Sequence, residues 1–193
     1  MFLKEITLFL LPLFIAGLIH HCLIIKRNLF AILAKPIDFG LTIGQKRLFG
    51  DSKTLRGFVA MAFLTGIMFW PLNFLLGLPL KIHPFLAGIL LGLGYSLGEL
   101  PNSFIKRMFG LKESSLINGP ARILQHIFDQ TDSVIGALLA FLLVYTPSML
   151  LITVLFFTGT LLHIIVDLAL YNFGYKKDSV HSTSQNCPRD NRS

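Results

Sequence analysis

Five long apolar runs divide this chain, at about residues 5–25, 58–78, 84–101, 133–147 and 149–171. A helix needs about 20 mostly apolar residues to cross a bilayer. Soluble domains carry roughly a quarter charged residues, whereas here 53% of the residues are hydrophobic and 14% are charged. We therefore expect an all-α, polytopic integral membrane protein with about five transmembrane helices. The fourth run is short, and joining it to the fifth as one interrupted span would leave four.

Lysine and arginine are distributed unevenly among the segments between these runs. Of the 17 basic residues, only Lys4 and Lys81 lie outside the segments 26–57 and 102–131 and the C-terminal tail. Cytoplasmic loops of membrane proteins are enriched in Lys and Arg. The sequence therefore predicts a protein of the cytoplasmic membrane with its N-terminus outside and with both long loops and the tail in the cytoplasm.

Three other readings of the composition are excluded. Two cysteines at opposite ends of the chain, Cys22 and Cys187, do not form a disulfide framework or a Cys-rich metal site. The basic residues are not interleaved with aromatics outside the apolar runs, so we expect no nucleic-acid partner. The first run lacks a small-x-small cleavage site, which indicates a retained span. We expect one membrane domain over residues 1–175 and a polar, disordered tail over 176–193.

Two aspartates, Asp129 and Asp132, stand directly before the fourth run in "HIFDQTDSV". One interpretation is a helix cap, in which Asp129 or Thr131 begins the next helix near its positive dipole end. The other is a cation site, because residues three apart share one helix face and carboxylates bind hard cations. Taken alone, the stretch favours the cap.

The third run ends in "GYSLGELPNSFIKR", where polar residues recur at intervals of three and four. Ser96, Glu99, Ser103 and Lys106 would share one face if the helix continues beyond Pro101. A snorkelling helix end accounts for the basic residues but not for Glu99. This face therefore predicts a polar site where the helix leaves the bilayer.

The first loop, "KPIDFGLTIGQKRLFGDSKTLRGF", combines glycines with hydrogen-bond donors. Glycine lets backbone N–H groups approach an anion, and Lys and Arg neutralise its charge. The spacing of Gly44, Gly50 and Lys53 does not match a Walker A motif, and no strand precedes it. Two interpretations stay open on composition: a triphosphate-binding loop, or a basic loop that contacts anionic lipid headgroups.

Two further features are polar or small residues inside the runs. His163 and Asp167, at i, i+4 in the fifth run, are either functional or a satisfied packing contact. The stripe of Gly88, Gly92 and Ser96 suits close packing on a neighbouring helix and permits a homodimer.

Two motifs together resemble a known family. "LGELPNSFIKR" followed by "DQTDS" resembles the signature of membrane CTP-dependent cytidylyltransferases, the CDP-diacylglycerol synthases. The more similar branch is the small CDP-archaeol synthases with their bacterial relatives, because "PID" and "GQKRLFGDSKTLRGF" are similar to the first cytoplasmic loop of that branch. Glu99 stands where the larger synthases usually have Asp, and their Asp-Arg-x-Asp is here Asp129-Gln130-Thr131-Asp132.

The resemblance implies transfer of a cytidylyl group from CTP to a lipid phosphate of the archaetidic- or phosphatidic-acid type, giving a CDP-activated lipid and pyrophosphate. It also implies Mg²⁺ at Asp129 and Asp132, with Glu99 as a third ligand and a second cation left open; the spacing alone indicates only a hard cation. The expected partners are CTP, the lipid phosphate and membrane lipids. The residues expected to bind substrate or act in catalysis are Gly50, Asp51, Lys53, Thr54, Arg56, Ser96, Ser103, Lys106 and Arg107. A CTP-dependent polyprenol or phytol kinase is the alternative enzyme, and a small transporter subunit is a third hypothesis.

Overall fold

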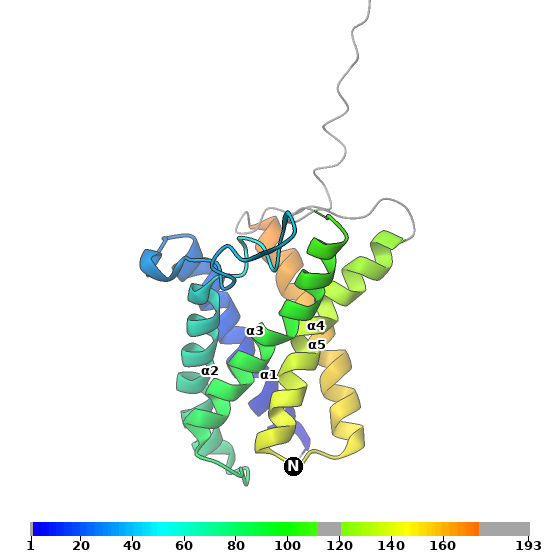
Figure 1. Cartoon of the computed structure of the whole chain (residues 1–193). Helices are drawn as coiled ribbons and strands as arrows, with labels where there is room; N and C mark the ends of the chain where they lie inside the picture. The colour runs from blue at the N-terminus through cyan, green and yellow to red at the C-terminus, as the bar shows by residue number, and fades with distance from the viewer. Residues whose placement is uncertain (1, 112–120, 174–193) are drawn as a thin grey trace, which may run out of the picture.

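The computed structural model describes residues 2–111 and 121–173, and over these ranges the chain is a bundle of helices (Figure 1). The helices are α1 (Phe2–Ile19), α2 (Leu55–Leu76), α3 (Pro84–Met108), α4 (Ala121–Val144) and α5 (Met149–Asn172). A π-helical turn, His20–Ile25, continues α1, and a 3₁₀ turn, Ala31–Leu33, follows it. The tail prediction for residues 176–193 lies outside the described residues.

Four segments of the described chain are long and apolar enough to cross a membrane: Phe2–Ile25, Leu55–Leu76, Ile127–Val144 and Met149–Leu170. Helix α3 is of similar length, but it carries the polar residues of the predicted site. It packs between α2 and α4 (Figure 1). The expected all-α membrane fold is confirmed.

The last two predicted runs are separate helices. Helix α4 ends at Val144 and α5 begins at Met149, with four residues that include Pro147 between them. Proline has no N–H to donate and its ring clashes with the preceding turn, so a continuous helix is disfavoured there. The alternative of one interrupted span is therefore wrong.

The bounds predicted for the long second loop, residues 102–131, are also wrong at both ends. Helix α3 continues through Pro101 to Met108, and α4 begins at Ala121, well before the apolar run at residue 133. Polar residues interrupt the apolar runs at both of these helix ends, so apolarity alone did not mark the boundaries.

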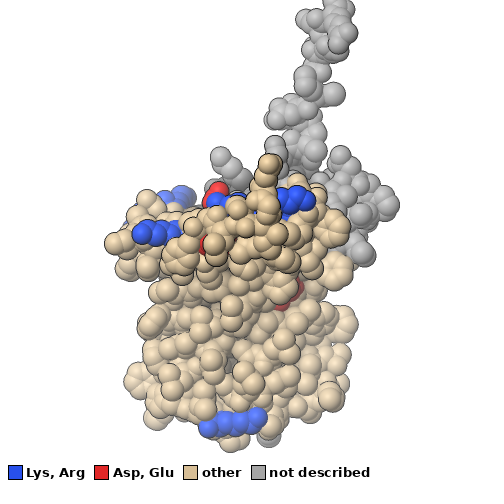
Figure 2. Space-filling model, viewed as in Figure 1, with Lys and Arg blue, Asp and Glu red and all other residues tan. Residues whose placement is uncertain are grey.

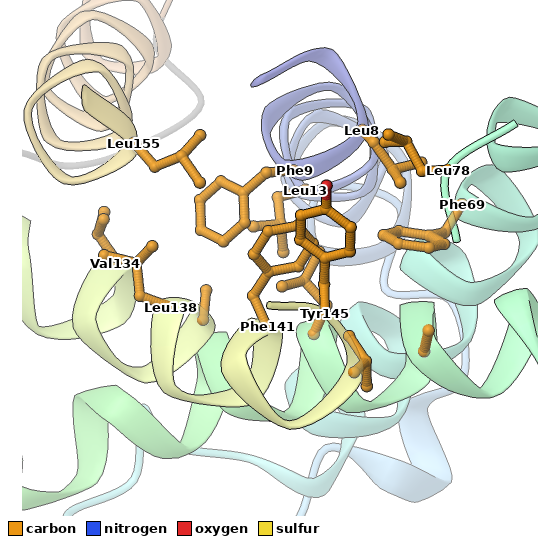
Figure 3. Close-up of a cluster of buried hydrophobic side chains, with 14 of the residues drawn as sticks. Leu8, Phe9, Leu13, Phe69, Leu78, Val134, Leu138, Phe141, Tyr145 and Leu155 are labelled. Carbon is orange, nitrogen blue, oxygen red and sulfur yellow. The ribbon is translucent and has the colours of Figure 1, made fainter. Parts of the chain in front are cut away.

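The apolar core fills the half of the bundle that contains the N-terminus (Figure 3). Phe9 of α1 packs edge-on against Phe141 of α4, with ring centroids 5.3 Å apart. Tyr145 stacks beside Phe141 and donates a hydrogen bond to the buried Glu5 carboxylate. This half therefore contains the apolar contacts that hold the bundle together.

Glycines set the separation between α3 and its two neighbours. A Cβ atom on Gly92 would lie 2.3 Å from the Met61 carbonyl oxygen of α2, and one on Gly136 would lie 2.1 Å from the Gly94 carbonyl oxygen. Only glycine allows backbones to approach this closely. The stripe at Gly88 and Gly92 is thus occupied by α2 of the same chain and supplies no argument for a homodimer.

The first loop contains a short antiparallel hairpin, β1 (Thr42–Ile43) and β2 (Lys46–Arg47), above the C-terminal end of α3 (Figure 1). The Lys46 ammonium donates to the Met108 carbonyl oxygen, 2.5 Å away. A cation at a helix C-terminus interacts favourably with its exposed carbonyls. Figure 2 shows the Lys and Arg side chains of this view concentrated at the hairpin end of the molecule, with one group at the far end.

Candidate active site

The polar face predicted on α3 is confirmed as a cavity wall. The cavity has a volume of about 640 Å³ and is lined on this side by Ser96, Glu99, Ser103 and Lys106. Because the helix is not broken at Pro101, the intervals of three and four keep these side chains on one face. Arg107 lines the same cavity.

Asp129 and Asp132 line the cavity from α4. The helix begins at Ala121, about two turns before Asp129. The backbone N–H groups around both aspartates are therefore inside the helix and do not need a side-chain cap. The cap interpretation is wrong, and the two carboxylates need another role.

Asn102 joins these two carboxylates. Its Nδ2 donates to Oδ1 of Asp129 at 2.6 Å and to Oδ2 of Asp132 at 2.8 Å. Lys106 also donates to Asp129, in an ion pair. Sequence reasoning missed Asn102, although its spacing from Glu99 and Lys106 placed it on the same face and its side chain carries both a donor and an acceptor.

Glu99 is held by the first loop and by α4. Its Oε2 forms an ion pair with the Lys53 ammonium, and its Oε1 accepts a hydrogen bond from Ser133 Oγ at 3.1 Å. Burial lowers the pKa of Lys53, but the adjacent Glu99 carboxylate outweighs burial and the pKa is raised. In the described part of the chain, no three His, Cys, Asp or Glu side chains are grouped so as to hold a metal. The structure thus places Glu99 in an ion pair and does not group it with both aspartates.

Asp38 organises the first loop. Its carboxyl is fully buried and accepts hydrogen bonds from the backbone N–H groups of Gly40, Phe49 and Gly50, at 3.0, 3.1 and 3.3 Å. The Arg47 guanidinium donates to it at 2.6 Å. Burial raises the pKa of Asp38, but these donors together lower it to about 2. Sequence reasoning assigned Asp38 no role; the Asp-x-Gly spacing typical of a turn was the available signal.

The remaining predicted residues of the first loop reach the cavity with one exception. Lys53, Thr54, Arg56 and Asp51 line it, whereas Gly50 does not, because its N–H is turned to Asp38. Three of the lining residues also form contacts within the protein. Asp51 is paired with Arg47 at 2.8 Å, Thr54 caps α2 by accepting from the Gly57 N–H, and Arg56 donates to Asn28 and Leu29.

The cavity has a second, apolar wall between α1 and α5. This wall is formed by Leu10, Leu13 and Phe14 of α1 and by Leu162, Val166 and Leu170 of α5. A further groove of about 310 Å³ continues from it along Leu10, Phe14 and Leu162 toward the N-terminal end of α1. The same cavity is therefore lined by charged groups on one side and by hydrocarbon side chains on the other.

Comparison with known proteins identifies the family. The family described as CarS-like CDP-archaeol synthase matches residues 3–180. The chain belongs to this CDP-archaeol synthase family.

Two relatives show how far the likeness extends. The CDP-archaeol synthase of Methanopyrus kandleri is 34% identical over 141 residues, which are 71% of this chain and 69% of the relative. That of Halorubrum lacusprofundi is 32% identical over 170 residues, which are 78% of this chain and 88% of the relative. These findings confirm the resemblance to CDP-archaeol synthases. They do not support the expected similarity to bacterial relatives of that branch.

A solved structure has the same fold. It is described as an intramembrane enzyme for the biosynthesis of archaeal membrane lipids, with a TM-score of 0.56 and 24% sequence identity. The match covers 84% of this chain and 92% of that one. The bundle of this CDP-archaeol synthase family member is therefore an established intramembrane fold.

In this member of the CDP-archaeol synthase family, the "DQTD" motif is tied to α3 and α5. The His163 Nδ1 lies 3.1 Å from the Gln130 carbonyl oxygen, and its Nε2 lies 3.1 Å from the Tyr95 hydroxyl. Because a carbonyl can only accept, Nδ1 carries the proton and Nε2 accepts from Tyr95 in the neutral ring. Gln130 Nε2 in turn donates to Asp167 at 3.1 Å. His163 and Asp167 thus both have hydrogen-bond partners within the protein, as the packing interpretation predicted, and both also line the cavity.

Proposed function

We propose that this chain transfers a cytidylyl group from CTP to a lipid phosphate, forming a CDP-activated lipid and pyrophosphate. Its family carries the name of this activity. The observation that carries the proposal is that Asp129 and Asp132 share one cavity with four Lys and Arg side chains and an apolar wall. A water-soluble triphosphate and a lipid headgroup must meet at such a boundary. The lipid is of the archaetidic- or phosphatidic-acid type.

The reaction needs positioning and charge neutralisation rather than a covalent enzyme intermediate. An oxygen of the lipid phosphate attacks the α-phosphorus of CTP and forms a new P–O bond. The bond from the α-phosphorus to the oxygen that bridges to the β-phosphorus breaks, and pyrophosphate leaves with the electron pair. Lys53, Lys106 and Arg107 line the cavity and are the cations that would bind the phosphate oxygens. Ser103 would donate a hydrogen bond beside them.

The residues present fit a magnesium ion at Asp129 and Asp132. Both carboxylates lie within hydrogen-bond distance of one Asn102 nitrogen, so they converge on a small volume. Carboxylate oxygens of this kind are the ligands of hard cations. A bound Mg²⁺ would neutralise charge that develops on the transferred phosphate. Before the ion binds, Asn102 and Lys106 offset the repulsion between the two carboxylates.

The orientation belongs to the same proposal. The hairpin and the C-terminal end of α3 lie at one end of the bundle (Figure 1), where the basic side chains concentrate (Figure 2). Ser103, Lys106 and Arg107 of that end of α3 line the cavity. CTP is a cytoplasmic nucleotide, and basic loops favour the cytoplasm. We place this end in the cytoplasm and the N-terminus outside. Accessibility labelling of residues 46 and 81 from the two sides would test this directly.

The deciding experiment uses the purified chain in lipid with CTP labelled at either the α- or the γ-phosphate. We expect α-label in the lipid product and release of pyrophosphate, with a lipid phosphate as the acceptor. Transfer of γ-label to a lipid alcohol, with release of CDP, would instead establish the kinase. A panel of diacyl and isoprenoid lipid phosphates in the same assay would define the acceptor.

A further inference from the structure

The chain leaves α1 through an exposed segment, residues 26–35, which we call the surface turn. Every side chain over residues 26–32 is exposed. Three of them are large and apolar: Leu29, Phe30 and Ile32 are 42%, 65% and 79% exposed. The walls of the cavity do not include any residue of the surface turn. It is therefore a surface separate from the candidate active site.

The backbone of the surface turn is held in an unfavourable conformation. Asn28 and Phe30 have φ angles of 49° and 54°, in the left-handed region that bulky side chains rarely adopt. Such strain persists only where the surroundings stabilise it. Because most of the Phe30 side chain is exposed, packing within the protein does not supply that stabilisation. The conformation points to a partner outside the chain.

Two sets of hydrogen bonds fix the surface turn beside the first residues of α2. Arg56 Nη1 donates to Asn28 Oδ1 at 2.8 Å and to the Leu29 carbonyl oxygen at 3.3 Å. The Leu55 N–H donates to the Lys35 carbonyl oxygen at 2.9 Å. Because the apolar span of α2 begins at Leu55, the surface turn lies at the depth where this span enters the bilayer. In Figure 1 the turn projects sideways past α2.

Basic side chains lie on both sides of the apolar ones. Arg27 precedes Phe30 and Lys35 follows Ile32, and both basic side chains are exposed. Neither takes part in an ion pair among the described residues. The sequence has no Asp or Glu over residues 6–37 to offset their charge. Aromatic and aliphatic side chains flanked by Lys and Arg are typical of segments that lie in the surface of an anionic bilayer.

We propose that the surface turn anchors the chain on an anionic bilayer surface. The Phe30 and Ile32 side chains enter the edge of the hydrocarbon. Arg27 and Lys35 bind phosphates of the lipid headgroups. These lipids belong to the surrounding leaflet and lie outside the cavity, so the proposal goes beyond the proposed function and does not depend on it.

Tryptophan fluorescence in vesicles tests the depth of the surface turn. Trp70 is the single tryptophan of the chain, so Phe30→Trp in a Trp70→Phe background reports from the turn alone. The vesicles contain phosphatidylcholine and phosphatidylglycerol, with bromine on the acyl chains close to the headgroup. We expect the brominated lipid to quench this tryptophan strongly and acrylamide in the water to quench it weakly.

Phe39→Trp in the same background is the matched control. Phe39 is also exposed, at 70%, and also left-handed, with φ of 48°, but it belongs to the part of the first loop that Asp38 organises. We expect acrylamide to quench the tryptophan at position 39 and the brominated lipid to leave it bright. Equal quenching by acrylamide at positions 30 and 39 would overturn the anchor and would leave the exposed apolar side chains to a protein partner.

The headgroup contact is tested by varying the fraction of phosphatidylglycerol. Quenching of the Phe30→Trp protein by brominated lipid should rise with that fraction. Adding Arg27→Gln and Lys35→Gln should increase the fraction needed for the same quenching several-fold, because each basic side chain near an anionic surface contributes a factor of about five. Lys81→Gln removes a charge from the opposite end of α2 and should change nothing. Quenching that is independent of phosphatidylglycerol would overturn the headgroup contact.

A further variant tests whether Arg56 holds the surface turn in place. Asn28→Gly removes the side-chain acceptor of Arg56, and glycine adopts the left-handed conformation without strain. We expect weaker quenching by brominated lipid and stronger quenching by acrylamide at position 30 than with Asn28 present. Each protein is first shown to elute and melt like wild type. Unchanged quenching would show that the Arg56 contact does not set the depth of the turn.

Discussion

Lys53 and Glu99 form an ion pair that fastens the first loop to α3. Each side chain is 24% exposed, so the pair is largely desolvated, and Glu99 also accepts from Ser133 of α4. One interaction therefore links three segments that are far apart in the sequence. Breaking a buried pair by removing one partner leaves an uncompensated charge and costs more than the intact pair contributes.

We expect Lys53→Met and Glu99→Gln to lower the free energy of unfolding by on the order of 2 kcal/mol each, and the double variant to recover most of that loss. Activity should not recover, because Lys53 is also proposed to bind phosphate. Thermal unfolding in detergent and turnover with CTP would be measured on the same preparations. Additive losses of stability would show that Lys53 and Glu99 are not energetically coupled in the detergent-solubilised protein.

Asp129→Asn and Asp132→Asn should each lower turnover on the order of a hundredfold or more, because an amide is a poor replacement for a carboxylate ligand of a hard cation. Both residues lie inside α4, where Asn and Asp have similar helix propensity, so the melting temperature should stay close to wild type. Asp167→Asn is the matched control, since an amide oxygen can still accept from Gln130, and we expect it to keep turnover within about threefold. A Mg²⁺ titration that is identical for both aspartate variants and wild type would contradict the metal role.

Asn102→Ala should lower turnover by about ten- to a hundredfold and raise the Mg²⁺ concentration needed for half-maximal activity, because groups that orient metal ligands have effects of this size. Asn172→Ala, which removes the same side chain from an exposed position at the end of α5, serves as the control. If turnover of Asn102→Ala falls but its Mg²⁺ dependence does not move, Asn102 acts on the substrate and not on the carboxylates.

Asp38 predicts a pH dependence for the first loop. Its pKa is lowered in the folded loop from 3.8 to about 2, so the stabilisation is fully present above about pH 4 and is lost as the pH falls toward 2. Digestion by pepsin across this range should show cleavage within residues 38–51 only near the acid end. Asp38→Asn should be cleaved at every pH in the range, and a pH profile identical to wild type would exclude Asp38 as the organising group.

Gly136→Val should destabilise the bundle by a few kcal/mol, because the added atoms would overlap the backbone of Gly94 and Gly98. The same change should reduce activity, since it moves Asp132 away from Asn102. Gly17→Ala is the control for adding a methyl group to a helical glycine, because the space there is open. The melting temperature distinguishes them, and equal melting of both variants would mean that α3 and α4 can separate at low cost.

The parts of this site that sequence could predict are those that depend on local spacing. Ser96, Glu99, Ser103 and Lys106 were placed on one face by the period of the helix, and the cavity confirms that face. The parts that could not be predicted depend on distant partners. Thr54 pairs with Pro36, and Leu55 donates to the Lys35 carbonyl at 2.9 Å, which brings the two ends of the first loop together. No local pattern encodes that contact.

The start of α4 shows a different limit. Its first turns, before Asp129, are not marked by a continuous apolar run, so hydropathy placed the helix start too late. Arg122, Gln125 and His126 interrupt the apolar pattern of those turns, so a hydropathy window excludes them from a span. The roles of the predicted site residues remain predictions, and the variants above test them one at a time.

The glycine contacts of α3 also determine how the molecule can move. With Gly88 and Gly92 against α2, and Gly94 and Gly98 against Gly136 of α4, these three helices can neither slide nor roll past one another without backbone collision. They behave as one rigid frame that carries the carboxylates and Asn102. The glycines of α1 and α5 meet only side chains or open space, so we expect any opening that exchanges a lipid for its larger product to come from these two helices. Product release would therefore be sensitive to the thickness and fluidity of the surrounding bilayer, even though the chemistry occurs within a frame that the bilayer does not deform.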